Sequence, residues 1–167
     1  MYRSARTPSQ KQRKRYLIIG LLIILLSVPL TLLAMLKRKG WLYVIRGSEY
    51  SHYLDWIVAQ SQHETNSWRS ELFLNNNNLF GMKVPSKREY FGNGGTPAPD
   101  GGMYAKYDTW ADSAKDFLSW LRYVKFPKDA LTVDRYVYLL KKFGYFTDSE
   151  ENYLGGVKHW LEVGYEK

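Results

Sequence analysis

Residues 60–68 read Gln60-Ser-Gln-His-Glu-Thr-Asn-Ser-Trp68, and residues 75–83 read Asn75-Asn-Asn-Asn-Leu-Phe-Gly-Met-Lys83. Before Glu64, apolar residues recur with the i, i+3, i+4, i+7 spacing of a helix that buries one face. These residues are Tyr50, Tyr53, Leu54, Ile57 and Val58. Glu64 follows Ile57 by seven residues and falls on the same face. A carboxylate there is costly unless it is paired or protonated, so the pattern indicates a carboxyl group with a raised pKa.

A long apolar segment precedes this helix. Residues 16–36 are 21 residues without a charge, mostly Leu and Ile. At about 1.5 Å per residue, a helix of this length can cross a hydrocarbon core of roughly 30 Å. Basic residues are more numerous before the segment than after it, which predicts an N-in, C-out orientation. A cleaved signal peptide is the alternative, but its apolar region would run ~7–15 residues and end in a small-x-small site, which this segment lacks.

These features predict a single-pass protein of the cytoplasmic (inner) membrane. Residues 1–15 form a basic cytoplasmic tail, residues 16–36 an uncleaved transmembrane signal anchor, and residues 37–48 a linker. Residues 49–167 form a folded domain on the periplasmic or extracytoplasmic side.

Charge and composition exclude several classes of function. The chain carries +8, but residues 1–39 hold nine basic residues and no acidic one, so the other 128 residues are close to −1. The basic excess therefore belongs to the membrane flanks, and no nucleic-acid partner is predicted. The chain has no cysteine and no His/Asp/Glu cluster with metal-ligand spacing, so neither a metal nor another cofactor is expected. It also lacks a phosphate-binding glycine loop and a Ser-His-Asp arrangement.

The exported part is predicted to be α+β and mainly helical, with a small irregular β lobe. The first helix is expected from about Glu49 to Gln62, and residues 66–107 are rich in Asn, Gly and Pro. Within them, residues 88–91 and 103–107 are expected to pair as a hairpin. Thr109, Thr132 and Ser149 are N-cap candidates for three further helices. A cleft between the lobe and the helices would suit a polymer substrate.

Four motifs in order resemble those of the glucosaminidase family of glycoside hydrolases (family 73). They are His63-Glu-Thr65, the Asn75–Lys83 stretch, Tyr107-Asp-Thr-Trp-Ala-Asp-Ser113, and Gly144-Tyr-Phe-Thr-Asp148 followed by Tyr153. The resemblance covers about residues 50–167 and is closest to bacterial and phage variants. It implies a lysozyme-like fold and an endo-β-N-acetylglucosaminidase that cleaves the β-1,4 bond after N-acetylglucosamine in peptidoglycan. The family's catalytic acid is the Glu of the first motif, which corresponds to Glu64.

The chain departs from this family at two places. The Gly-Trp-Gly that usually follows the catalytic Glu is replaced by Asn66-Ser-Trp68-Arg69. The second carboxylate, often in a Thr-Glu-Tyr strand, is matched to Glu89, with Asp100 as the other candidate. A carboxylate about 5 Å from Glu64 would allow a retaining route, and one at roughly 6.5–9.5 Å an inverting route. If neither carboxylate reaches, a water held by Tyr145 or an Asn side chain, or the acetamido group of the substrate, must substitute.

The predicted mechanism makes Glu64 the general acid, desolvated against Trp68 and Phe80. The predicted catalytic residues are Glu64, Glu89 and Tyr145, and the predicted substrate-binding residues are Asn78, Phe80, Trp68 and Tyr107. Structural alternatives exist for several of them. Glu64 could pair with Lys83 or Arg69 at the helix end, Asn78 could shape its loop, and Tyr107 and Tyr145 could be core aromatics. Trp110, Trp120 and Trp160 fit helix patterns and are expected in the core.

Together these observations predict a membrane-anchored peptidoglycan hydrolase. Its expected partners are peptidoglycan glycan strands and, through residues 16–36, the lipid bilayer. The sequence does not identify a protein partner in the machinery of the cell envelope. One alternative is a lytic transglycosylase of the same fold, which needs a single Glu. Another is a cell-wall-binding module that has lost hydrolysis.

Overall fold

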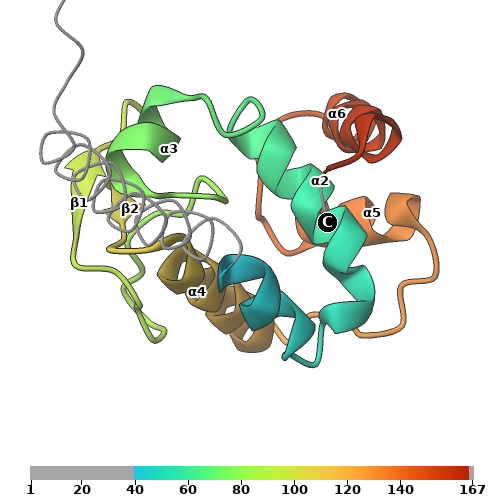
Figure 1. Ribbon diagram of the computed structural model, residues 1–167, viewed down its shortest axis with the longest axis horizontal. Coiled ribbons are helices and arrows are strands. Elements are labelled where there is room, and N and C mark those ends of the chain that lie inside the picture. The colour runs from blue at the N-terminus through green and yellow to red at the C-terminus, as the bar shows by residue number, and fades with distance from the viewer. Residues whose placement is uncertain (1–39, 166–167) are drawn as a thin grey trace, which may run out of the picture. The chain divides into compact units, whose positions relative to one another are not determined.

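The computed structural model describes residues 40–165 (Figure 1). In chain order its elements are η1 (Ser51–Tyr53), α2 (Leu54–Glu64), α3 (Glu71–Asn76), β1 (Gly94–Pro97), β2 (Met103–Lys106), α4 (Trp110–Tyr123), α5 (Val133–Lys142) and α6 (Glu150–Val163). The two strands form an antiparallel sheet. The domain is therefore mainly helical with a small β lobe, as the sequence predicts. The predicted transmembrane segment lies outside the described residues, and no helix within residues 40–165 is long and apolar enough to cross a membrane.

The three predicted N-caps are confirmed. The side chain of Thr109 accepts a hydrogen bond from the backbone N–H of Asp112 at the start of α4. Thr132 and Ser149 cap α5 and α6 in the same way. Such caps satisfy backbone N–H groups that have no partner within the helix, so they fix where each helix begins.

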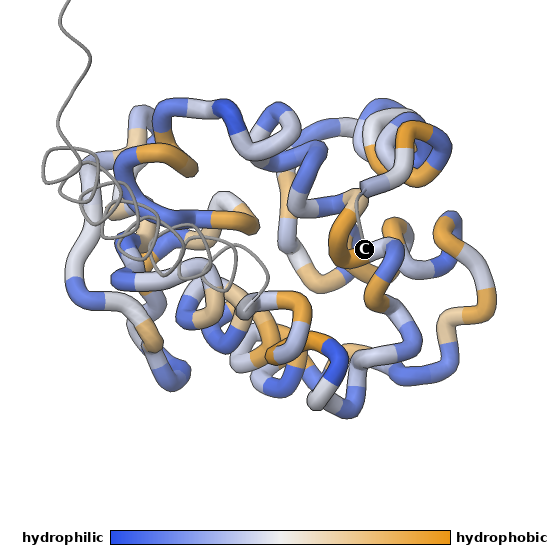
Figure 2. Tube along the Cα trace, in the orientation of Figure 1, coloured by the Kyte–Doolittle hydropathy of each residue, from blue (hydrophilic) through white to orange (hydrophobic). Residues whose placement is uncertain are grey.

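Helix α2 is the centre of the helical part. It packs against α6, and α6 packs against α5. The lobe with α3, β1 and β2 lies on one side of α2 in Figure 1, and α5 and α6 lie on the other. Hydrophobic and hydrophilic residues alternate along these helices in Figure 2, and the core members Ile57, Phe117, Leu140 and Val157 are fully buried. This burial agrees with the helical spacing of apolar residues in the sequence.

The predicted linker at residues 37–48 is wrong for residues 40–46. Residues 40–46 are helical, and the side chains of Trp41, Leu42 and Ile45 are buried, with at most 5 % of each exposed. The ring of Trp41 packs edge-on against Trp68 and Phe80, with centroid distances of 6.5 and 6.1 Å. The prediction failed because residues 41–45 are all apolar and give no periodic pattern, while the hydrophobic surface they cover is formed by distant residues.

The predicted hairpin is half correct. The second strand, β2, falls within residues 103–107, but its partner is β1 at Gly94–Pro97 and not residues 88–91. Arg88 is held on α4 by a buried ion pair with Asp116, with 2.7 Å between Nη2 and Oδ2. That anchor holds Arg88 on α4, and residues 88–91 reach β2 through the Tyr90 hydroxyl, which hydrogen-bonds to the backbone of Lys106. Gly95 fits against β2 because an added Cβ would lie 2.9 Å from the carbonyl oxygen of Tyr104.

Candidate active site

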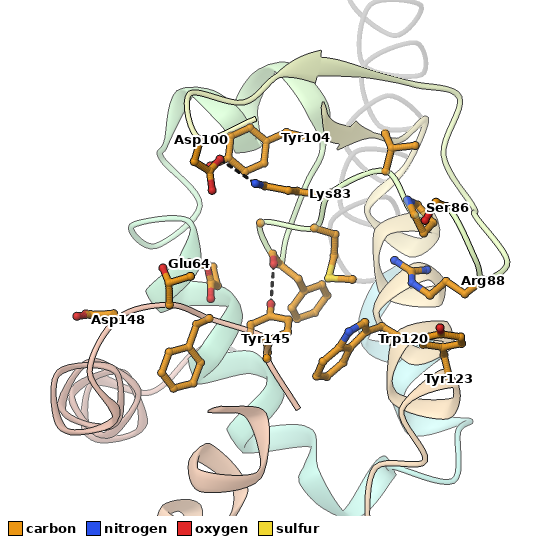
Figure 3. A pocket seen from close by; sticks show the side chains of 18 of the residues that line it. Glu64, Lys83, Ser86, Arg88, Asp100, Tyr104, Trp120, Tyr123, Tyr145 and Asp148 are labelled. Atoms are coloured by element: carbon orange, nitrogen blue, oxygen red, sulfur yellow. Dashed lines mark hydrogen bonds and ion pairs between the residues drawn. The ribbon is translucent and has the colours of Figure 1, made fainter. Parts of the chain in front are cut away.

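A cleft of about 740 Å³ lies between the lobe and the helices (Figure 3). Its walls come from the end of α2, the loop after α3, the β1–β2 hairpin, α4 and residues 144–148. This volume is within the range of ~300–1,000 Å³ that is typical of ligand sites. The cleft is where the sequence predicts a substrate site, so each predicted residue can be placed relative to it.

Glu64 is the last residue of α2, and its side chain lines the cleft. Its Oε1 accepts a hydrogen bond of 2.5 Å from the hydroxyl of Tyr153 on α6. Burial raises the pKa of the Glu64 carboxyl to about 7, although the hydrogen bond from Tyr153 acts in the opposite direction. Desolvation dominates because the charged form loses more hydration than one hydrogen bond returns. Glu64 can therefore hold a proton near neutral pH, which a general acid requires.

Gly81 leaves room for the carboxyl group of Glu64. It has a φ of +58°, and a Cβ built there would lie 3.0 Å from Oε2 of Glu64. A side chain at position 81 would thus be strained and would press on the carboxyl oxygen. This close approach explains why the second motif has a glycine at position 81.

The Asn-rich run shapes the loop that carries Gly81. Asn78 is buried, and its Nδ2 donates to the carbonyl oxygens of Met82 (2.9 Å) and Ala105 (3.0 Å). Its Oδ1 accepts from the backbone N–H groups of Phe80 and Met82. Asn77 ends α3 in the left-handed conformation. Asn78 therefore has the architectural role weighed in the sequence: its amide is engaged in the interior and does not line the cleft.

Tyr145 and Phe80 both line the cleft, as predicted. The hydroxyl of Tyr145 donates to the carbonyl oxygen of Phe80 at 2.6 Å, and the Phe80 ring stacks on Phe117. Burial raises the pKa of Tyr145 well above its usual range, so the hydroxyl stays protonated. In this arrangement Tyr145 connects the C-terminal segment to the loop that carries Gly81.

The wall beside Glu64 is aromatic. Phe146 stacks on Tyr153, with ring centroids 3.8 Å apart, and His63 meets the edge of Tyr153 at 4.8 Å. His63 also fills the space over Gly156 of α6, where a Cβ would lie 2.2 Å from its ring. Burial lowers the pKa of His63. His63 is therefore a half-buried wall of the cleft, packed against α6.

The two candidates for a second carboxylate occupy different places. Glu89 is exposed and does not line the cleft, and its backbone carbonyl accepts from Ser119. Asp100 lines the cleft from the β1–β2 hairpin and pairs with Lys83, with 2.8 Å between Oδ1 and Nζ. The hydrogen bond from Lys83 lowers the pKa of Asp100, so that carboxylate is ionised at neutral pH. The geometry thus favours Asp100 over the predicted Glu89.

Two further predicted binding residues lie outside the cleft lining. Trp68 is half-buried, and its indole Nε1–H donates to the Ser61 hydroxyl at 2.9 Å. Tyr107 is buried and its hydroxyl donates to Asp116 at 2.9 Å. The structure thus engages both side chains in contacts away from the cleft, and their substrate contact stays a prediction. Residues 66–68, which replace the family's Gly-Trp-Gly, all have positive φ.

Tyr153, Trp120 and Tyr123 are among the cleft residues that were not assigned to it from the sequence. Tyr153 follows the fourth motif in the sequence, and its bond to Glu64 joins residues 89 positions apart. Trp120 was expected in the core, and Tyr123 was not singled out, yet both line the cleft. The signal in the sequence for Trp120 and Tyr123 was their i, i+3 spacing at the end of α4, and the signal for Tyr153 was its place in the fourth motif. Among residues 40–165 there is no group of three or more His, Asp or Glu side chains that could hold a metal.

The comparisons with known proteins agree with this geometry. Residues 42–163 match the family model Glucosaminidase, described as mannosyl-glycoprotein endo-beta-N-acetylglucosaminidase. No curated protein matches the chain at a significant level. One similar solved structure is a type VI secretion system effector–immunity complex from Pseudomonas protegens, with a TM-score of 0.50 and 21 % identity over 66 % of this chain and 76 % of that one. At that identity the likeness concerns the fold. Because the family model spans most of the described domain, the chain belongs to the glucosaminidase family.

Proposed function

We propose that this protein is a membrane-anchored peptidoglycan hydrolase that cleaves the β-1,4 bond after N-acetylglucosamine, with Glu64 as its general acid. The observation that carries the proposal is the carboxyl group of Glu64, which lines a cleft of about 740 Å³ and has a pKa raised to about 7. Glycoside hydrolysis needs such a protonated acid at the leaving oxygen. Membership of the glucosaminidase family supports this chemistry.

In the proposed reaction Glu64 gives its proton to the glycosidic oxygen as the bond to the anomeric carbon breaks. Water then supplies a hydroxyl group to that carbon, and its remaining proton passes to a base. Asp100 is the lobe carboxylate that lines the cleft in ionised form, which makes it the better candidate for stabilising the oxocarbenium-like centre or activating the water. Its ion pair with Lys83 places it on the hairpin side of the cleft, across from α2 (Figure 3).

Membrane anchoring through residues 16–36 is part of the proposal and is supported by their length and lack of charge. Only residues 37–39 separate this segment from the helical residues 40–46. Three residues reach at most about 11 Å, so the proposed tether is short. The N-terminus would lie in the cytoplasm and the catalytic domain outside it.

A lytic transglycosylase is the second candidate. It is favoured by one observation: Glu64 has a desolvated carboxyl group, whereas the other two carboxylates that line the cleft, Asp100 and Asp148, are exposed. Such an enzyme uses one Glu and closes the sugar on itself, without water. The two reactions leave different ends on the glycan.

The test is mass spectrometry of fragments released from purified peptidoglycan by the full chain in mild detergent. Glu64→Gln should lower release by a factor of about 10²–10⁴, because general acid catalysis contributes that much. Glu89→Gln is the matched control and should retain activity, since Glu89 lies outside the cleft lining.

New reducing N-acetylglucosamine ends that vanish with Glu64→Gln support the hydrolase. Anhydro-muramyl ends would assign a transglycosylase instead. Wall binding without release by any variant would point to a binding module.

A further inference from the structure

Tyr123 is an aromatic residue that lies outside the hydrophobic core. It is the last residue of α4, it lines the cleft, and 54 % of its surface is exposed. Among the described residues its ring has no aromatic partner, unlike Trp120, which packs edge-on against Tyr145 at 5.1 Å. An exposed aromatic ring in a cleft leaves a large apolar surface in water, which is a property of binding sites rather than of folding cores.

Trp120 and Tyr123 form one surface. They are three residues apart on α4, a spacing that puts side chains on the same side of a helix. The ring of Trp120 is also held by Phe117, which stacks parallel to it with 6.2 Å between the ring centroids. In Figure 3 both rings lie across the cleft from Glu64, and Tyr145 lies between Glu64 and Trp120. The three rings thus form a row along the cleft, from the carboxyl group of Glu64 to the end of the cleft that α4 lines.

Polar groups line the same end of the cleft. Ser86 and Arg88 are seen above Trp120 and Tyr123 in Figure 3, and Lys87 also lines the cleft. The Arg88 guanidinium is committed to Asp116 by two hydrogen bonds of 2.7 and 2.8 Å. Ser86 and Lys87 are exposed, and neither side chain has an ion pair or hydrogen bond within residues 40–165. An apolar ring surface below exposed hydroxyl and ammonium groups matches a sugar, whose ring face is apolar and whose edge carries hydroxyls.

We propose that Tyr123 is a substrate-binding residue which, with Trp120, forms a subsite for one pyranose ring of a glycan strand, away from the bond at Glu64. The apolar C–H face of the sugar packs on the phenol ring, and its hydroxyls meet Ser86 and Lys87. The subsite makes the cleft bind a strand of several sugars rather than a single linkage. The inference rests on the proposed function for the glycan nature of the substrate, but it does not require that the bond be cleaved.

Binding can be measured without cleavage in the Glu64→Gln protein, using the full chain in mild detergent and a soluble six-sugar peptidoglycan glycan fragment. Adding Tyr123→Ala should raise Kd about tenfold. Tyr123→Phe, which keeps the ring, should stay within about twofold. Tyr138→Ala is the matched control, because Tyr138 is also an exposed helical tyrosine, at 39 %, but does not line the cleft. In the active protein, Tyr123→Ala should raise KM and leave kcat nearly unchanged.

Equal Kd values for Tyr123→Ala and Tyr138→Ala would overturn the subsite, as would failure of every variant to bind the fragment. An effect of Tyr123→Phe as large as that of Tyr123→Ala would also overturn stacking, since only the hydroxyl is lost. Loss of hydrolysis in the parent protein with Tyr123-dependent binding would refute the proposed enzyme and keep the subsite. Because Tyr123 is exposed, its truncation should leave the unfolding temperature unchanged, and circular dichroism verifies this.

Discussion

At the scale of single residues, Glu64 and Tyr153 set the expected pH dependence. The protonated form of Glu64 is the active acid, so kcat/KM should fall as pH rises through about 7. The Tyr153 hydroxyl stabilises the ionised carboxylate and lowers the pKa of Glu64. Tyr153→Phe removes that bond and should therefore move the alkaline limb of the profile upward by about one unit. A pH profile of kcat/KM checks this, and a downward shift would contradict the assignment of Glu64 as the acid.

Gly81 provides a second prediction at this scale. Gly81→Ala should cost about 1–2 kcal/mol of unfolding free energy, because φ is +58°. It should also lower kcat strongly, since the new Cβ would lie 3.0 Å from Oε2 of Glu64. Gly164→Ala is the control: its φ is +74°, and nothing lies within 4 Å of the added Cβ. Urea unfolding should show a cost for both variants, larger for Gly164→Ala because its ψ of −174° lies in a region that essentially only glycine adopts, and only Gly81→Ala should lose activity. Equal activity in the two would show that the contact with Glu64 does not matter.

At the scale of elements, the lobe depends on the ion pair between Arg88 and Asp116. The side chains are 6 % and 0 % exposed, and Asp116 also accepts from Tyr107. Arg88→Met leaves a buried charge without its partner and should cost about 3–5 kcal/mol. Lys158→Met, which breaks the exposed pair with Asp134, should cost less than about 1 kcal/mol. Urea titrations at pH 7 compare the two, and equal costs would mean that the lobe is not held by this pair.

At the scale of the whole molecule, the domain includes residues 40–46. Trp41→Ala should cost about 3–5 kcal/mol, because the indole is 2 % exposed and contacts Trp68 and Phe80. Tyr43→Ala, at 63 % exposure, should stay within about 0.5 kcal/mol. A chain that begins at residue 49 should accordingly be far less stable than one that begins at residue 40. Equal thermal unfolding temperatures for these two chains would restore the linker interpretation.

At this scale, contacts between distant parts of the chain limit what the sequence could predict about the site. Helix caps and helix faces depend on residues within a few positions, so Thr109, Thr132 and Ser149 could be identified as caps. Contacts such as the one between Tyr153 and Glu64 join distant positions, and no local pattern encodes them. Glu89 was preferred over Asp100 because a motif was matched by order along the chain. In the structure, the ion pair between Arg88 and Asp116 instead holds the residues near Glu89 against α4.

The sequence by itself determined the mainly helical class, the starts of α4, α5 and α6, and the place of Glu64 near the end of α2, because hydrophobic periodicity and capping are local effects. The motifs also indicated the family. The tertiary structure alone decided which polar and aromatic side chains face the cleft. Asn78, Trp68 and Tyr107 are used by the interior, whereas Asp100, Trp120 and Tyr123 line the cleft. The physical reason is that burial and desolvation depend on which segments pack together, and this is settled by long-range contacts.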